Sequence, residues 1–107
     1  MSPTSGGPVW GVATEELNAT ILEWPPLKGP AAHVNRERDV VLVVLAGSAA
    51  IEIDGLRHDA GVGEVVVIEK GTSRRITAGP MGARYLTVHR KRPGLEVAKA
   101  PLASEAG

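Results

Sequence analysis

Short hydrophobic runs recur along the chain about every ten residues, and turn-forming residues separate them, which is the spacing of a β-sandwich or barrel. No run keeps a helical period; residues 14–24 come nearest, but Asn18, Thr20 and Ile21 disfavour a helix there. The pattern predicts an all-β protein. Its expected strands cover residues 9–13, 18–24, 33–47, 49–53, 56–60, 64–69, 73–78, 83–90 and 95–97.

The segments between these runs carry the residues that tight turns need. Asp54-Gly55 separates two runs and predicts a two-residue hairpin, because both turn positions need positive φ. A second turn is expected at residues 79–82. Residues 25–30 include three prolines, which lack the N–H that sheet pairing uses, so we expect an irregular connector there.

The run at residues 40–45, VVLVVL, is apolar at every position. A strand with one face in water would alternate, so this strand is expected to be buried on both faces. Either an N-terminal strand or a second subunit must then cover its outer face. For so small a chain the second is favoured, and we expect a homodimer.

Composition narrows the class of protein. The 107 residues suit one domain, expected at residues 9–97, between loose tails at 1–8 and 98–107. There is no cysteine, and twelve basic residues balance twelve acidic ones, so neither nucleic acid nor an anionic membrane is an expected partner. With no secretory signal pattern and no long apolar run, a cytoplasmic location is expected.

Two stretches flank the predicted hairpin, one with His33, Asn35 and Gly47 and the other with Gly63, Gly71 and Arg74. Together they resemble the paired motifs of small single-domain cupins, the RmlC-like jelly-roll superfamily. The first cupin motif is His-x-His, three or four residues, Glu, six residues, Gly. Here it reads His33-Val-Asn35, with Val40 at the glutamate position, Asp39 one residue earlier, and Gly47 closing it.

The second cupin motif is Gly, five residues, Pro-x-Gly, two residues, His, three residues, Asn. Here it runs from Gly63 through Gly71, with Arg74 in place of the histidine and Ala78 in place of the asparagine. The resemblance covers about residues 29 to 90 and implies a cupin-type double-stranded β-helix, the jelly-roll barrel.

The same resemblance implies a remodelled metal site. Cupins that bind Fe, Mn, Ni or Zn do so with three histidines and a glutamate, of which only His33 remains unambiguously. Asn35 offers a neutral amide oxygen, and the guanidinium of Arg74 offers no lone pair. The first expectation is therefore that the protein has no cofactor, and the alternative is that it binds a divalent metal.

Arg74 has two interpretations. Facing inward, it could bind a small anionic ligand, with His33, Asn35 and Asp39 as further polar groups. Alternatively it pairs with Asp39 or Glu37 and only fills the former metal space. Because neighbouring strand residues face opposite ways, only one of Arg74 and Arg75 can point inward.

The alternation in residues 83–90 puts Tyr85, Thr87 and His89 on one face, which is too polar for ordinary core. Tyr85 and His89 are therefore candidate ligand-binding residues. His33 and His89, with Asp39 or Glu37, could also form a rearranged Zn or Fe(II) site. The competing interpretation leaves His89 in water at the strand end.

Three functions remain open at the level of sequence. The favoured one is binding of a small, anionic molecule in the barrel without the usual metal. The second is a metal-dependent oxygenase or isomerase with an altered ligand set, and the third is an interaction module with a filled barrel. Whether the protein is an enzyme is left undecided, because one fold hosts many activities.

Overall fold

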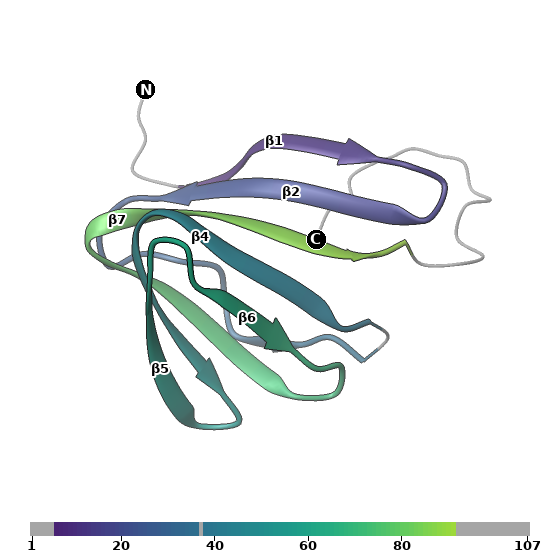
Figure 1. Ribbon diagram of the computed structural model, residues 1–107. Helices are drawn as coiled ribbons and strands as arrows, with labels where there is room; N and C mark the ends of the chain where they lie inside the picture. The colour runs from purple at the N-terminus through teal and green to yellow at the C-terminus, as the bar shows by residue number, and fades with distance from the viewer. Residues whose placement is uncertain (1–5, 37, 92–107) are drawn as a thin grey trace.

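A computed structural model describes residues 6–36 and 38–91, apart from the side chain of His33. This part of the chain is all-β and its strand pairs are antiparallel, as the sequence predicts (Figure 1). None of its segments is a helix long and apolar enough to cross a membrane. The strands are β1 (Gly7–Ala13), β2 (Leu17–Trp24), β3 (His33–Val34), β4 (Val40–Ile53), β5 (Leu56–Gly61), β6 (Val65–Ile68) and β7 (Ser73–Arg90).

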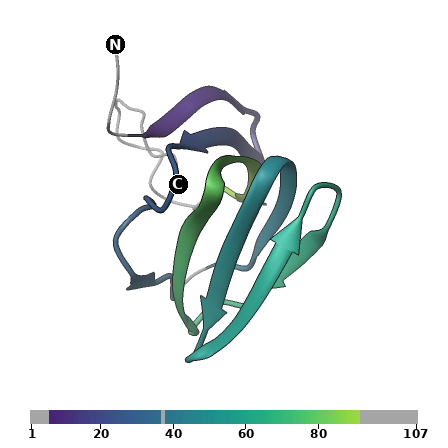
Figure 2. The same ribbon diagram turned by 90° about the vertical axis from the view of Figure 1, so that its left-hand side faces the viewer.

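Two long strands, β4 and β7, contribute to both halves of the molecule (Figure 1, Figure 2). The first part of β4 pairs with β6 and with the last part of β7, which also pairs with β2 and, through it, with β1. The second part of β4 pairs with β5 and with the first part of β7, which also pairs with β3. The two halves face each other across the core.

β4 and β7 reach both halves because each strand bends, and the bends lie where the sequence predicts strand ends. The sequence predicts separate strands at 33–47 and 49–53 and at 73–78 and 83–90, but β4 and β7 run through the breaks at residue 48 and at residues 79–82. The expected strand at 33–47 is also wrong in part, because β3 ends at Val34 and β4 begins at Val40. The register of β4 shifts between Val44 and Ala46 and again between Gly47 and Ala49. Such bulges bend a strand without ending its hydrogen bonding.

Gly47 is required at the bend of β4. Its φ of 71° suits glycine, and a Cβ there would run into the backbone carbonyl of Gly82 on β7. The Asp54-Gly55 hairpin is confirmed, since both residues have positive φ, 49° and 84°.

The core is made of aliphatic side chains and one tyrosine that the bent strands enclose. Its central members belong to β4, where alternate residues point inward. The buried set is Val40, Leu42, Val44, Ala49, Ile51, Ala60, Ile68, Ile76, Ala78, Ala83 and Tyr85.

The N-terminal strands extend the sheet and do not cover it. β2 pairs edge to edge with β7, and β1 pairs with β2, so the expectation that an N-terminal strand covers the outer face of residues 40–45 is wrong. The expected tail at residues 1–8 is also corrected, because Gly7 and Pro8 belong to β1. The rest of both expected tails, and the strand expected at 95–97, lie outside the described residues.

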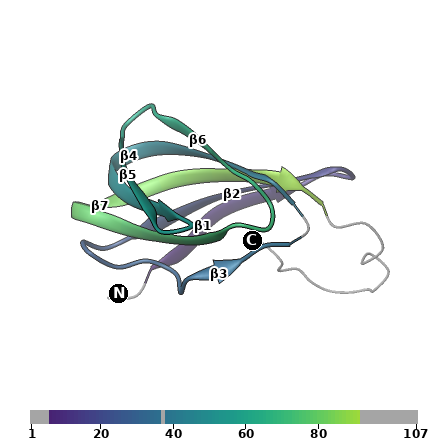
Figure 3. The ribbon, with the colours of Figure 1, turned by 90° about the horizontal axis from the view of Figure 1, so that it is seen from below.

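The proline-rich connector closes one side of the barrel (Figure 3). It is irregular, as its prolines predict, but the bend of β7 holds it by backbone hydrogen bonds. Leu27 N–H donates to the carbonyl of Ala78 over 3.1 Å, and Ala78 N–H donates to the carbonyl of Lys28 over 2.8 Å. These bonds hold the connector against the bend of β7.

Candidate functional site

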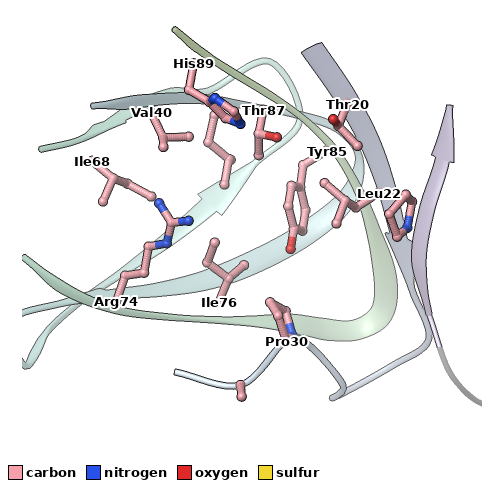
Figure 4. Close-up of a pocket in the computed structure, with 13 residues that line it drawn as sticks. Thr20, Leu22, Pro30, Val40, Ile68, Arg74, Ile76, Tyr85, Thr87 and His89 are labelled. Atoms are coloured by element: carbon pink, nitrogen blue, oxygen red, sulfur yellow. The ribbon is translucent and has the colours of Figure 1, made fainter. Parts of the chain in front are cut away.

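A cavity with a volume of about 150 Å³ lies between the two halves (Figure 4). Its wall is mainly apolar, with five polar or charged side chains. An apolar cavity of roughly this volume can hold a molecule the size of benzene. The lining residues are Pro8, Thr20, Leu22, Pro30, Ala31, Val40, Leu42, Ile68, Arg74, Ile76, Tyr85, Thr87 and His89.

Arg74 points its guanidinium into this cavity between the side chains of Ile68 and Ile76 (Figure 4). Arg75, its neighbour on β7, is exposed, as strand alternation predicts. Burial is the largest influence on Arg74 and lowers the pKa of its guanidinium; the nearby charge of Arg38 lowers this pKa further. The described residues of the cavity wall include no acidic side chain. The guanidinium of Arg74 therefore places a positive charge in a mainly apolar cavity wall.

Tyr85 contributes the second polar group, and its hydroxyl also lies in the cavity (Figure 4). The side chain is 1% exposed. Burial raises the pKa of Tyr85 to about 12, although the indole of Trp24 and the charge of Arg74 partly oppose this. Within the described part of the chain, the hydroxyl completes no hydrogen bond of good geometry. A buried hydroxyl in that state favours a ligand that accepts a hydrogen bond from it.

His89 is buried at the cavity wall, with only 4% of its surface exposed, so the interpretation that leaves it in water is wrong. Its Nδ1 lies 3.2 Å from the backbone carbonyl of Arg90. Since a carbonyl only accepts, Nδ1 donates, and the lone pair of the neutral ring is then on Nε2. Tyr85, Thr87 and His89 all line the cavity, as the alternation along β7 predicts.

Asn35 and Asp39 were predicted to join this group, but the structure places both elsewhere. The side-chain oxygen of Asn35 accepts the N–H of Arg38 over 3.2 Å, in a local turn. Asp39 is exposed, and its carboxylate accepts the backbone N–H of Lys70 over 2.9 Å. Neither residue lines the cavity. Their polar groups hold the loops that enter β4 and β7.

His33 is placed only by its backbone, which pairs with Arg74 across β3 and β7. Its side chain and all of Glu37 lie outside the described residues. A ligand-binding or metal-binding role for His33, and an ion pair between Arg74 and Glu37, therefore stay predictions.

Sequence reasoning missed Thr20 and the prolines that line the cavity. Thr20 pairs with Thr87, so their side chains share one face, but this register between β2 and β7 is visible only in the folded chain. Pro8 and Pro30 follow no periodic pattern, and only the folded chain brings them to the wall.

No protein-family model matches the chain, and no curated protein matches it. Solved structures do. KdgF from Halomonas sp. superimposes with a TM-score of 0.72 at 19% identity, over 79% of this chain and 78% of that protein. A cupin protein from Bacteroides fragilis gives 0.68 at 23% identity, over 80% and 75%. The protein has the cupin fold. A cupin-superfamily sugar phosphate isomerase from Silicibacter pomeroyi gives 0.67 at 17% identity, over 74% and 53%.

The cupin jelly roll predicted from the paired motifs is therefore confirmed. The side chains of this cavity can now be compared with the ligand set of metal-binding cupins. Val40 occupies the glutamate position and faces inward, while Asp39 faces out. Among the described residues, no three histidine, aspartate or glutamate side chains gather to hold a metal ion. The guanidinium of Arg74 would also repel a divalent cation at close range. The described donor set does not fit a metal.

Proposed function

We propose that this cupin binds a small organic anion, such as a carboxylate, in its barrel cavity. The observation that carries the proposal is the guanidinium of Arg74, which reaches into the same mainly apolar cavity as the hydroxyl of Tyr85. Arginine grips a carboxylate through two parallel N–H donors, and this contact strengthens where water is excluded.

The other groups of the cavity support an anion with an apolar body. The hydroxyl of Tyr85 keeps its proton, because its pKa is raised to about 12, so it can donate to the same anion. The apolar side chains of Leu22, Leu42 and Ile76 surround the remaining space. A compact aromatic or branched aliphatic carboxylate matches both the volume and the wall chemistry.

The test uses thermal unfolding with two matched probes, benzoate and its neutral analogue benzamide. Benzoate at millimolar concentration is expected to raise the Tm, because a ligand that binds only the folded state stabilises it. Benzamide is expected to have a much smaller effect. Arg74→Met should abolish the response to benzoate. Arg75→Met is the matched control, since it removes the same charge from the exposed face, and it should keep the response.

Three results would reject the proposal: equal responses to both probes, a full response to benzoate in Arg74→Met, or loss of the response in Arg75→Met. A series of larger aromatic and branched carboxylates, and inorganic phosphate, then defines the ligand class. No response to any of these anions in the unmodified protein would favour a filled barrel.

A further inference from the structure

The indole of Trp24 and the phenol of Tyr85 are neighbours on the inner face of the sheet. Across β2 and β7, Trp24 pairs with Ala83 and Leu22 pairs with Tyr85. Directly opposed residues of an antiparallel sheet point to the same side, and residues two positions further along are diagonal neighbours within reach of aromatic side chains. Tyr85 belongs to the core, and Trp24 packs against it. The two aromatic side chains therefore lie within reach of each other.

The backbone of Gly6 lies against one edge of the indole. A Cβ at Gly6 would lie 2.7 Å from Cε3 of Trp24, so this close approach needs glycine. Cε3 and Nε1 belong to opposite long edges of the indole. With the Cε3 edge against Gly6, the other edge turns inward, and Nε1 is buried. The fold therefore fixes the direction of the indole N–H.

This N–H acts on the hydroxyl of Tyr85. An indole nitrogen only donates a hydrogen bond, whereas a phenol hydroxyl both donates and accepts. Burial has the largest influence on the pKa of Tyr85 and raises it; a hydrogen bond from Trp24 comes next and lowers it. Within the described residues neither Nε1 nor the hydroxyl completes a hydrogen bond of good geometry, so the contact between them is loose. An oxygen that accepts from the indole directs its own proton away from the indole, and the hydroxyl of Tyr85 lies in the cavity (Figure 4).

We infer that Trp24 is a positioning residue of the anion site: its indole N–H orients the hydroxyl of Tyr85 to donate to the anion that Arg74 binds. The inference rests on the proposed function, because the anion receives the last hydrogen bond. Trp24 is not among the described residues of the cavity wall, so it acts through Tyr85. Two hydrogen bonds that run in one direction polarise and strengthen each other. The pair therefore selects a ligand group that accepts a hydrogen bond and disfavours one that only donates, such as an ammonium group.

The first test is Trp24→Phe, which removes the N–H and keeps an aromatic ring. Trp10→Phe is the matched control, since Trp10 is the other tryptophan of the chain and is 51% exposed on β1. In isothermal titration calorimetry, Trp24→Phe should weaken benzoate binding about fivefold, the usual effect of one hydrogen bond, and Trp10→Phe should leave it unchanged. In a Tyr85→Phe background, Trp24→Phe should have little further effect, because the interaction is already lost.

The NMR signal of the Trp24 Nε1–H reports the same contact in the unmodified chain, which covers the case in which Trp24→Phe does not fold. The signal is assigned in Trp10→Phe, where it is the single indole signal. It is expected to shift as benzoate binds, and to stay unchanged at saturating benzoate in Tyr85→Phe. The Trp10 signal should not move in either protein.

The side-chain Nε–H signal of Arg74 separates failure of this inference from failure of the proposed function. If the Arg74 signal does not respond to benzoate, both are wrong. If it responds while the Trp24 signal stays still, or if Trp24→Phe binds benzoate as tightly as the unmodified chain, only the role of Trp24 is wrong. A Trp24 shift that persists in Tyr85→Phe, or an equal loss of affinity in Trp10→Phe, would also overturn that role.

Discussion

Arg74 and Tyr85 lie in opposite halves of the same strand, β7, yet both side chains reach the same cavity (Figure 4). The bend at residues 79–82 turns the strand back over the core, so its two ends face each other. Each group influences the other: the charge of Arg74 lowers the pKa of Tyr85 against the larger effect of burial. One bent strand therefore supplies both polar groups of the proposed anion site.

The titration of Tyr85 gives the first prediction. Because this is the single tyrosine of the chain, the phenolate absorbance reports it alone. Its midpoint is expected at about 12 in the folded protein, against 10.0 for an unperturbed tyrosine. The folded state then holds a proton that the unfolded state has lost, so stability falls as the pH rises from about 10 to about 12.

Urea unfolding at pH 9 and at pH 11.5 measures this loss, and Tyr85→Phe separates it from the titration of lysines and arginines. The variant should lose less stability over the same pH interval. A folded-state midpoint near 10 would show that the hydroxyl is in contact with water and would contradict the burial described above.

Metal binding gives the second prediction. Protein incubated with Fe, Mn, Ni or Zn and then exchanged into metal-free buffer should retain far less than one metal ion per chain by elemental analysis. The reason is that His89 is the one histidine on the described cavity wall, which has no carboxylate and which it shares with the cationic Arg74. Stoichiometric metal that disappears in His33→Ala would contradict this and would favour the altered ligand set instead.

The core gives the third prediction. Leu42 is fully buried on β4. Leu42→Ala should therefore lower the free energy of unfolding by about 2 to 5 kcal/mol, the usual cost of such a truncation. Leu56→Ala, at an exposed position, should lower the free energy of unfolding by much less. Similar losses in the two variants, measured by urea unfolding, would show that Leu42 is not packed as described.

The bend of β4 gives the fourth prediction. Gly47→Ala combines an unfavourable φ with a collision against the carbonyl of Gly82, so it should lower stability by more than about 1 kcal/mol. Gly61→Ala is the control, because a Cβ there would meet nothing within 4 Å. Thermal unfolding of both variants checks this, and an equally stable Gly47→Ala would mean that the bend does not need glycine.

Local signals predicted much of this arrangement. Alternation was enough to place Tyr85, Thr87 and His89 on one face and to separate Arg74 from Arg75, because strand geometry alone decides which way a side chain points. The Asp54-Gly55 hairpin followed from the backbone conformation that these residues favour. The resemblance to the cupin motifs supplied the expected fold, a jelly-roll barrel.

The remaining features depend on contacts between distant segments. Glycine and proline at residues 79–82 indicate a turn. The same residue types also occur where a strand bends, and the pairing of β7 with β4 decides for the bent strand. The carboxylate of Asp39 turns outward because the N–H of Lys70, 31 residues away, is there to donate to it. Sequence spacing alone does not reveal such a partner.

The most direct test of the anion site is the NMR signal of the Arg74 side-chain Nε–H during a titration with benzoate, assigned by its absence in Arg74→Met. This signal is expected to shift and saturate together with the ring signals of Tyr85, while the Nε–H signal of Arg75 does not move. If benzoate leaves the Arg74 and Tyr85 signals unchanged at concentrations that raise the Tm, the anion binds elsewhere and the central claim is wrong.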